Sequence, residues 1–117
     1  MSRLTTHVLD TALGRPAAGL AVSLFKVSTS GRTLLNQWIT NSDGRVSRPL
    51  LEGDDFVVGT FELSFDVAPY FASSSYEVSS PPFLDLVTLR FSIADVTTHY
   101  HVPLLVSPWS YSTYRGS

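Results

Sequence analysis

Cysteine is absent from the 117-residue chain, which excludes disulfides, thiolate zinc sites and a cysteine nucleophile. Charged residues are scarce at 15%, the formal net charge is -2, and there is no block of Lys or Arg. Nucleic acid is therefore not expected as a partner. No apolar run approaches membrane-spanning length, and residues 1–7 lack the apolar core of a secretory signal. With no terminal peroxisomal address either, we expect a cytoplasmic protein that does not bind membranes.

Several catalytic signatures are missing as well. No Ser lies in a Gly-x-Ser-x-Gly sequence, so the nucleophile elbow of many serine hydrolases is not indicated. There is no Gly-rich phosphate-binding loop. The acidic residues fall mostly in predicted loops, which argues against a glycosidase with paired carboxylates.

What the chain does have is apolar content, at 44% of residues. This is enough for one hydrophobic core, and we expect a single domain over residues 1–117. The low charge fraction suggests that other subunits cover part of the apolar surface. A surface rich in Ser and Thr is the alternative explanation.

Alternating apolar residues and turn signals predict an all-β sandwich of seven or eight short strands. Residues 60–67 alternate most clearly and predict a half-buried strand. In residues 83–93 the apolar positions change phase, which predicts a bulge or burial on both faces. A Pro in a first helical turn predicts one short helix at residues 68–76. The expected strands are 4–10, 20–27, 33–40, 45–50, 60–67, 83–93, 100–106 and 111–115, with a hairpin turn at 107–110.

The three histidines are the first candidates for a functional site. His99 and His101 are two residues apart, so on a strand they share one face at a Cβ spacing of about 6–7 Å, and His7 lies on another predicted strand. Three interpretations stay open. The histidines could be solvated or structural, could bind zinc together and activate a water, or could serve as acid–base groups near neutral pH.

Two arginines and a tyrosine extend this candidate set. Arg45 follows the turn signal Asn-Ser-Asp-Gly, and it is either a surface arginine or a planar fork of donors for carbonyl or anionic substrate atoms. Arg115 has the same two interpretations. Tyr114 could be a core aromatic residue or a phenol donor.

Four segments resemble the transthyretin-like proteins. The segment Leu4–Gly19 (LTTHVLDTALGRPAAG) is similar to their opening signature, and Thr40–Arg45 (TNSDGR) is similar to their central turn. The segment Gly59–Phe65 (GTFELSF) also fits. The final segment, His99–Ser117 (HYHVPLLVSPWSYSTYRGS), resembles the closing signature of one branch, the 5-hydroxyisourate hydrolases.

The resemblance implies a transthyretin-like (prealbumin-like) β-sandwich of seven to eight antiparallel strands. This sandwich assembles as a homotetramer, a dimer of dimers, with active sites between the dimers. It implies hydrolysis of 5-hydroxyisourate to 2-oxo-4-hydroxy-4-carboxy-5-ureidoimidazoline in urate catabolism, without cofactor or metal. A non-catalytic carrier of a small aromatic ligand is the alternative. The implied catalytic residues are His7, Arg45, His101 and Ser117, the last through its hydroxyl or terminal carboxylate. The expected substrate-binding residues are His99, Tyr114, Arg115 and Gly116.

Overall fold

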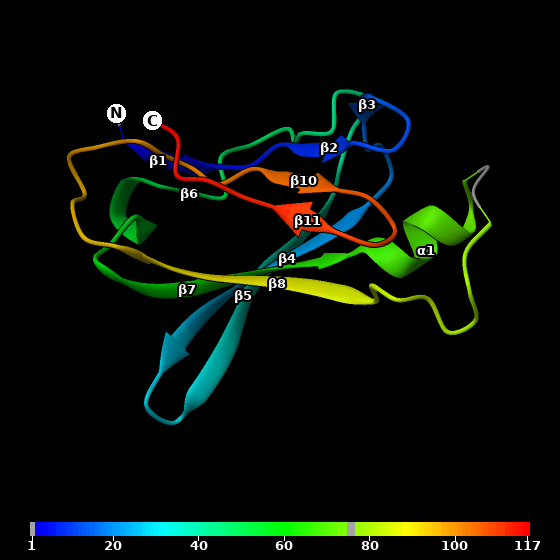
Figure 1. The fold of residues 1–117 in the computed structure, drawn as a ribbon. Helices are drawn as coiled ribbons and strands as arrows, with labels where there is room; N and C mark the ends of the chain where they lie inside the picture. The colour runs from blue at the N-terminus through cyan, green and yellow to red at the C-terminus, as the bar shows by residue number, and fades with distance from the viewer. Residues whose placement is uncertain (1, 75–76) are drawn as a thin grey trace.

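Two layers of β-structure face each other in the computed structural model, which describes residues 2–74 and 77–117 (Figure 1). One layer is a four-stranded sheet in the order β5-β4-β7-β8, and the other holds two smaller sheets, β6-β1-β9 and β11-β10-β2-β3. The predicted all-β sandwich is confirmed. The strands are β1 Arg3–Thr5, β2 Val8–Asp10, β3 Arg15–Pro16, β4 Ala21–Ser28, β5 Gly31–Ile39, β6 Leu51–Glu52, β7 Gly59–Asp66, β8 Leu86–Ile93, β9 Tyr100–His101, β10 Leu104–Val106 and β11 Tyr111–Ser112; the helices are α1 Val67–Ala72 and a 3-10 turn at Gly53–Asp55.

The single strands expected at 4–10 and 100–106 are each divided in two. β1 pairs with β9 and β2 pairs with β10, both in parallel, so the sandwich is mixed rather than wholly antiparallel. The breaks lie side by side. Pro103 has no N–H to give to the ladder, and the N–H of Val8 donates to the carbonyl of Gly44 at 2.8 Å instead. The loop at 41–45 therefore lies against the break between β1 and β2, where His7 lies.

Two further expectations need correction. Residues 45–50 form no strand, because the backbone of Arg45 accepts a hydrogen bond from Asn41 within the preceding turn (2.7 Å). The bulge expected within 83–93 is absent: β8 starts only at Leu86, and its pairing with β7 runs without a shift. The register shift of this sheet lies instead between β4 and β5.

The remaining differences concern the middle of the chain. The helix runs over residues 67–72 rather than 68–76, and residues 75 and 76 of that prediction lie outside the described part of the chain. Strand β7 is buried on both faces rather than half-buried. Glu62, on the face expected to be polar and solvated, is only 7% exposed because it pairs with Arg32 and Arg90 at 3.2 and 2.8 Å.

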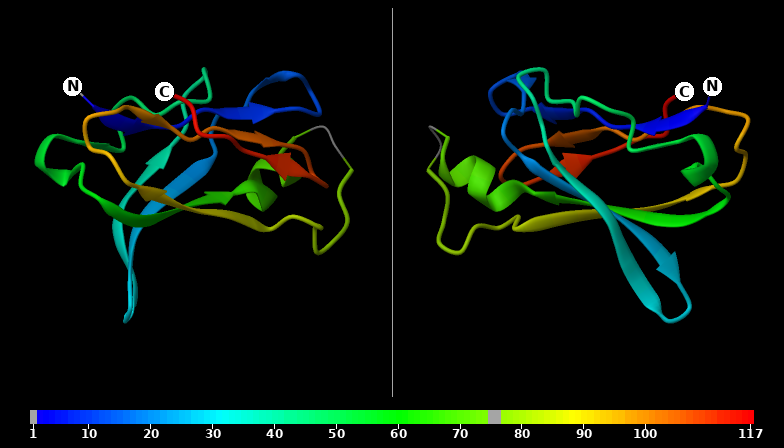
Figure 2. Two further views of the ribbon diagram at one scale, coloured as in Figure 1. Left: turned by 60° about the vertical axis from the view of Figure 1, so that its left-hand side comes forward. Right: turned by 180° about the vertical axis from the view of Figure 1, so that it is seen from behind.

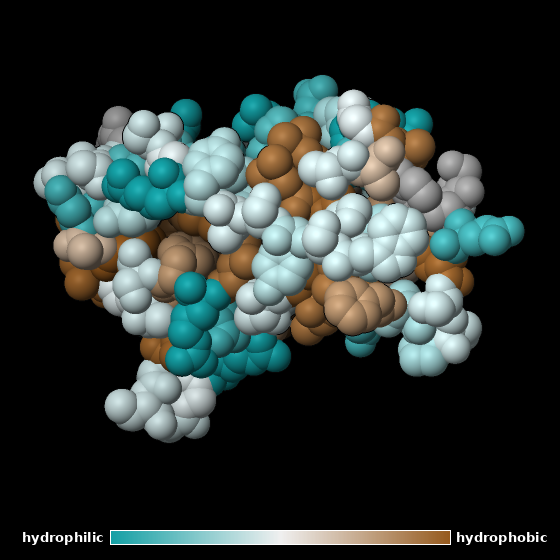
Figure 3. Space-filling model, in the orientation of Figure 1, coloured by the Kyte–Doolittle hydropathy of each residue, from teal (hydrophilic) through white to brown (hydrophobic). Residues whose placement is uncertain are grey.

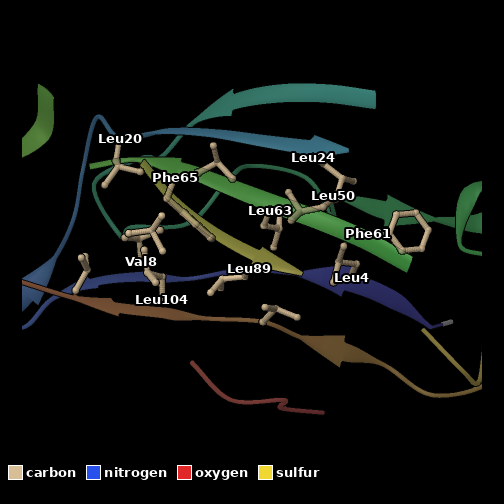
Figure 4. Packing of buried hydrophobic residues seen from close by; sticks show 14 of the residues in the cluster. Leu4, Val8, Leu20, Leu24, Leu50, Phe61, Leu63, Phe65, Leu89 and Leu104 are labelled. Atoms are coloured by element: carbon tan, nitrogen blue, oxygen red, sulfur yellow. The ribbon is translucent and has the colours of Figure 1, made fainter. Parts of the chain in front are cut away.

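The core lies between the layers and decides which side chains face outward (Figure 4). Leu4 of β1 and Val8 of β2, in the layer of two smaller sheets, pack with Leu63 and Phe65 of β7 in the facing sheet, and each such burial contributes about 1.5–3 kcal/mol. Since strand side chains alternate between faces, the inward positions of Leu4 and Val8 leave the intervening odd-numbered residues on the outer face of this layer. The candidate site lies on that outer face.

Two further features concern the outline and the surface of the molecule. The hairpin of β4 and β5 extends away from the body of the sandwich (Figure 2). Apolar patches lie among polar side chains on the face that carries β8 and β11 (Figure 3). Within the described residues, no helix has the length and apolar character needed to cross a membrane.

Candidate active site

Strand pairing brings the beginning and the end of the chain together at the outer face. In the parallel register of β1 and β9, Thr5 is the partner of His101. The hydroxyl oxygen Oγ1 of Thr5 lies 2.8 Å from Nδ1 of His101 and 3.3 Å from Nε2 of His99. Both rings thus reach one hydroxyl, as expected for histidines on a shared face, although β9 begins only at Tyr100.

His7 is fixed by the loop at 41–45. Its Nε2 lies 2.7 Å from the carbonyl oxygen of Asp43. A carbonyl oxygen only accepts, so Nε2 of His7 carries the proton, and in the neutral ring the free lone pair lies on Nδ1. The structure therefore defines which nitrogen of this imidazole is available to take a proton.

Gly44 allows this loop to approach. Its φ is 73°, in the left-handed region that glycine tolerates best. A Cβ at this position would overlap the carbonyl oxygen of Val8, and the side-chain amide oxygen of Asn41 accepts from the backbone N–H groups of Asp43 and Arg45 at 2.9 and 3.2 Å. The turn thus sets Arg45 next to the histidines.

The positive charge of Arg45 contributes to a lowered pKa of His101. Burial lowers the pKa of His101 below its usual 6.5, and the charges of Arg45, His7 and His99 lower that pKa further. His101 is consequently a neutral imidazole near pH 7, the form that accepts a proton. Arg3, Arg45 and Arg48 are among the residues that line a hollow beside Thr5, and three cationic residues there favour a carbonyl-rich or anionic ligand.

The C-terminal segment is attached to His101 by its backbone. His101 N–H donates to the carbonyl of Gly116 at 3.0 Å, and Gly116 N–H donates back to the carbonyl of His101 at 2.7 Å. A Cβ on Gly116 would lie 3.1 Å from Cβ and 3.3 Å from Cδ2 of His101, closer than ordinary contact. This position therefore suits glycine.

The other residues of the predicted set divide into two groups. The ring of Tyr114 lies near Gly116, and Ser117 follows Gly116 and is exposed. Arg115 is directed elsewhere: its guanidinium stacks on the ring of Tyr100 (4.2 Å) and donates to Thr98 Oγ1 at 3.1 Å. The structure brings His7, His99, His101 and Arg45 together with Gly116 but does not bring the side chain of Arg115 to the histidines.

The three-histidine zinc hypothesis finds no geometric support. Across residues 2–74 and 77–117, no three His, Asp or Glu side chains converge on a point where a metal ion could sit. One ring nitrogen of each histidine is instead near a protein oxygen, either the Thr5 hydroxyl or the Asp43 carbonyl.

Thr5 and Asn41 are the site residues that the sequence reasoning missed. The alternation of side chains along a strand could have identified Thr5, because Thr5 lies two residues before His7 and so on the same face. For Asn41 the signal was its place in the turn before Arg45, where Asn commonly accepts hydrogen bonds from backbone N–H groups.

The two-layer β-sandwich is the fold of transthyretin-like proteins. The chain belongs to the HIUase/Transthyretin family, whose model matches residues 4–116. It is 58% identical over 115 residues to 5-hydroxyisourate hydrolase 2 of Rhizobium meliloti (strain 1021). The aligned residues make up 98% of this chain and 96% of that protein. The predicted family and branch resemblance is thereby confirmed.

Solved structures agree with the family. The crystal structure of an (S)-allantoin synthase has a TM-score of 0.94 and 48% identity over 99% of this chain, which spans only 44% of that longer protein. Sea bream transthyretin in complex with thyroxine has a TM-score of 0.86 and 25% identity, covering 97% of this chain and 94% of that one. One fold thus serves proteins with different ligands, so the side chains of the site must decide the function.

Proposed function

We propose that this chain is a 5-hydroxyisourate hydrolase in urate catabolism and that His7, Arg45 and His101 carry out the reaction. The convergence of these three side chains on one outer face, from strands and a turn far apart in the sequence, is the observation that supports the residue roles. A carrier of a small aromatic ligand has no need of two proton-accepting imidazoles beside a guanidinium. We further propose that residues 1–117 act as one transthyretin-like domain in the cytoplasm.

The reaction needs water activated beside a carbonyl group. The oxygen of water attacks a ring carbonyl carbon of 5-hydroxyisourate, the ring C–N bond breaks, and the product carries a new carboxyl group and an N–H. One proton must leave the water as it attacks, and one must reach the departing nitrogen. No oxidant or metal is required for this balance.

Two imidazoles can share these proton transfers. His101, neutral because its pKa is lowered, accepts the proton of water at Nε2, the nitrogen that Thr5 does not contact. His7 is held by Asp43 at Nε2, so its Nδ1 orients the same water or takes part in the transfer to nitrogen. In this scheme neither histidine needs to change its protein contact during the attack.

Arg45 and the C-terminal segment complete the scheme. As the water attacks, negative charge develops on the carbonyl oxygen, and the guanidinium of Arg45 offers paired donors to it. The backbone pair between Gly116 and His101 holds the segment of Tyr114 and Ser117 beside the imidazole. Tyr114 and Ser117 then contact the substrate ring or the attacking water.

A homotetramer, a dimer of dimers, is the assembly that we propose. β8 and β11 are both edge strands. Leu89 and Phe91 of β8 and Tyr111 of β11 line a common apolar groove. Unpaired edges beside apolar surface favour pairing with another copy of the chain. Sedimentation velocity of the purified protein measures this directly, and a monomer at micromolar concentration would contradict the proposal.

A spectrophotometric assay tests the activity. Urate oxidase converts urate to 5-hydroxyisourate in the cuvette, and the loss of the 5-hydroxyisourate absorbance is followed with and without this protein. We expect loss well above the spontaneous rate, abolished in the double variant His7→Gln/His101→Gln. Unchanged decay in the presence of folded protein would instead favour the carrier, as would tight binding of an aromatic ligand without turnover.

A further inference from the structure

We propose that Thr5 is a positioning residue whose hydroxyl joins His99 to His101 and sets which nitrogen of His101 carries the proton. The proposal deepens the proposed function and rests on it for the catalytic consequence. Its structural part concerns the protonation of the imidazole and holds whether or not substrate is present.

The Thr5 hydroxyl has two ring nitrogens beside it but only one hydrogen. Thr5 Oγ1 lies 2.8 Å from His101 Nδ1 and 3.3 Å from His99 Nε2, but a hydroxyl has one hydrogen to donate. It can therefore donate to only one of these nitrogens. The other must donate to the lone pairs of the hydroxyl if both contacts are hydrogen bonds.

Two arrangements satisfy this count. In the first, His101 Nδ1–H donates to Thr5, and Thr5 donates to Nε2 of His99. In the second, all donors are reversed, and Nε2 of His101 then carries a hydrogen. Only the first leaves the lone pair on His101 Nε2, where the ring can accept a proton from water. We assign this arrangement to the resting protein.

The two arrangements are connected by a balanced proton relay. When His101 Nε2 gains a proton, the Nδ1–H bond of that ring breaks and its proton passes to Thr5 Oγ1. The O–H bond of Thr5 breaks in turn, and its proton forms a new bond to His99 Nε2. The positive charge moves from His101 to His99, with no other reactant consumed.

The charges around His101 favour this transfer. Arg45 acts on His101 as a positive charge from the loop at 41–45. Removing a proton from His101 relieves the repulsion with this guanidinium. His99 is partly buried, with its Nε2 directed at Thr5, so it is placed to receive the proton.

Hydrogen bonds of the backbone hold the segment that carries the Thr5 hydroxyl. Thr5 lies at the end of β1, where its carbonyl accepts from Val102 N–H at 2.9 Å. Its neighbour Thr6 is buried and donates to the carbonyl of Val102 at 2.7 Å. The Thr5 hydroxyl is therefore presented from a backbone held on both sides rather than from a free loop.

Nitrogen-15 NMR of histidine side chains tests the proposal without any substrate. The chain has three histidines, and His→Gln variants assign their signals. We expect neutral His101 in the wild type as the Nδ1–H tautomer. The near-isosteric Thr5→Val should return His101 toward the Nε2–H form common in water, whereas Thr5→Ser should keep the wild-type pattern.

The matched control is Thr60→Val, which removes a hydroxyl bonded to Ser92 on the far sheet at 2.8 Å and should leave the His101 signals and turnover unchanged. A wild-type His101 protonated at Nε2, or a tautomer unaltered in Thr5→Val, would overturn the proposal. Should Thr5→Val fail to fold, His99→Phe tests the link from the other side. Without the His99 acceptor the Thr5 hydroxyl can donate to His101 Nδ1, so we expect the share of the Nδ1–H tautomer and kcat both to fall, and an unaltered tautomer would overturn the proposal.

Kinetics provide the second readout. With 5-hydroxyisourate, Thr5→Val should lower kcat by about tenfold or more, with little change in KM, and should alter the acid limb of the pH profile. Thr5→Ser should restore both. If no variant and no wild-type protein turned over the substrate, the proposed function would fail while the NMR result still decided the tautomer.

Discussion

Gly116 and His101 exchange two backbone hydrogen bonds, at 3.0 and 2.7 Å, although 14 residues separate them along the chain. The pair leaves little room for a side chain at residue 116, where a Cβ would lie 3.1 Å from Cβ of His101 and the ring would have to shift by a few tenths of an ångström. The position of the imidazole and the path of the final residues are therefore one structural unit.

Gly116→Ala should disturb the contact between the final segment and His101. The added methyl group must displace either the final segment or the ring of His101, so we expect kcat for 5-hydroxyisourate to fall about tenfold or more. The fold should be little affected, because the residue lies outside the core. Circular dichroism melts and turnover of the same samples measure the two effects, with Ser112→Ala on the adjacent exposed strand as control. Wild-type turnover by Gly116→Ala, or by a chain lacking residues 116 and 117, would contradict a role for the segment.

Arg45→Ala should depress kcat by about 100-fold to 1,000-fold, the usual effect of losing one donor to a developing oxyanion. Arg45→Lys should recover only part of this loss, because an ammonium group lacks the planar pair of donors. Steady-state kinetics with freshly generated substrate measure both. Arg15→Ala on the exposed strand β3 serves as the control for loss of an arginine. Turnover by Arg45→Ala equal to that of Arg15→Ala would exclude Arg45 from catalysis.

The lowered pKa of His101 predicts a specific pH dependence. Activity needs the neutral ring, so the acid limb of kcat/KM should titrate below 6.5. Burial is the main cause and Arg45 the next, so Arg45→Ala should move the pKa of His101 upward. An unchanged pKa in Arg45→Ala, followed by NMR, would show that the guanidinium does not face the ring.

The same shift affects stability. Between the lowered pKa and 6.5 the unfolded chain binds more protons at this residue than the folded protein does. The contribution of His101 to the free energy of unfolding is therefore complete above about 6.5 and is lost as the pH falls through the folded pKa. Urea unfolding of the wild type and His101→Gln across this range measures it, and parallel pH profiles for the two would contradict the prediction.

Gly44→Ala should damage both fold and site. A left-handed conformation costs an alanine about 1–2 kcal/mol, and here the added Cβ also overlaps the Val8 carbonyl. Gly14→Ala is a close control, since its φ of 70° is similar and no atom lies within 4 Å of the added Cβ. We expect Gly44→Ala to lose clearly more stability in urea than Gly14→Ala, and to lose turnover because Arg45 moves. Equal losses in the two variants would contradict the close approach.

Much of the architecture was predictable from local patterns. Alternation and turn chemistry located most strands, and the Asn-Ser-Asp-Gly turn before Arg45 was recognisable because Asn and Gly favour that backbone. The family resemblance then selected His7, Arg45 and His101, which the structure brings to one face.

What could not be predicted depends on contacts between distant segments. The division of residues 4–10 into β1 and β2 follows from Pro103 and Gly44, neither of which is local to that strand. The direction of Arg115, stacked on Tyr100, depends on the strand face that Tyr100 occupies. The role of Thr5 requires knowing that it is paired with His101, and periodicity contains no information on register between strands so far apart.

The parallel pairing of β1 with β9 has a consequence for how the protein folds. Thr5 and His101 meet across 96 positions of sequence, and closing so long a loop is entropically costly. The β4–β5 hairpin, by contrast, needs only a short turn. Contacts of such long range slow folding, so a refolding chain should regain sheet signal before it regains activity. We therefore expect the recovery of turnover after dilution from urea to lag behind the recovery of the far-ultraviolet circular dichroism signal.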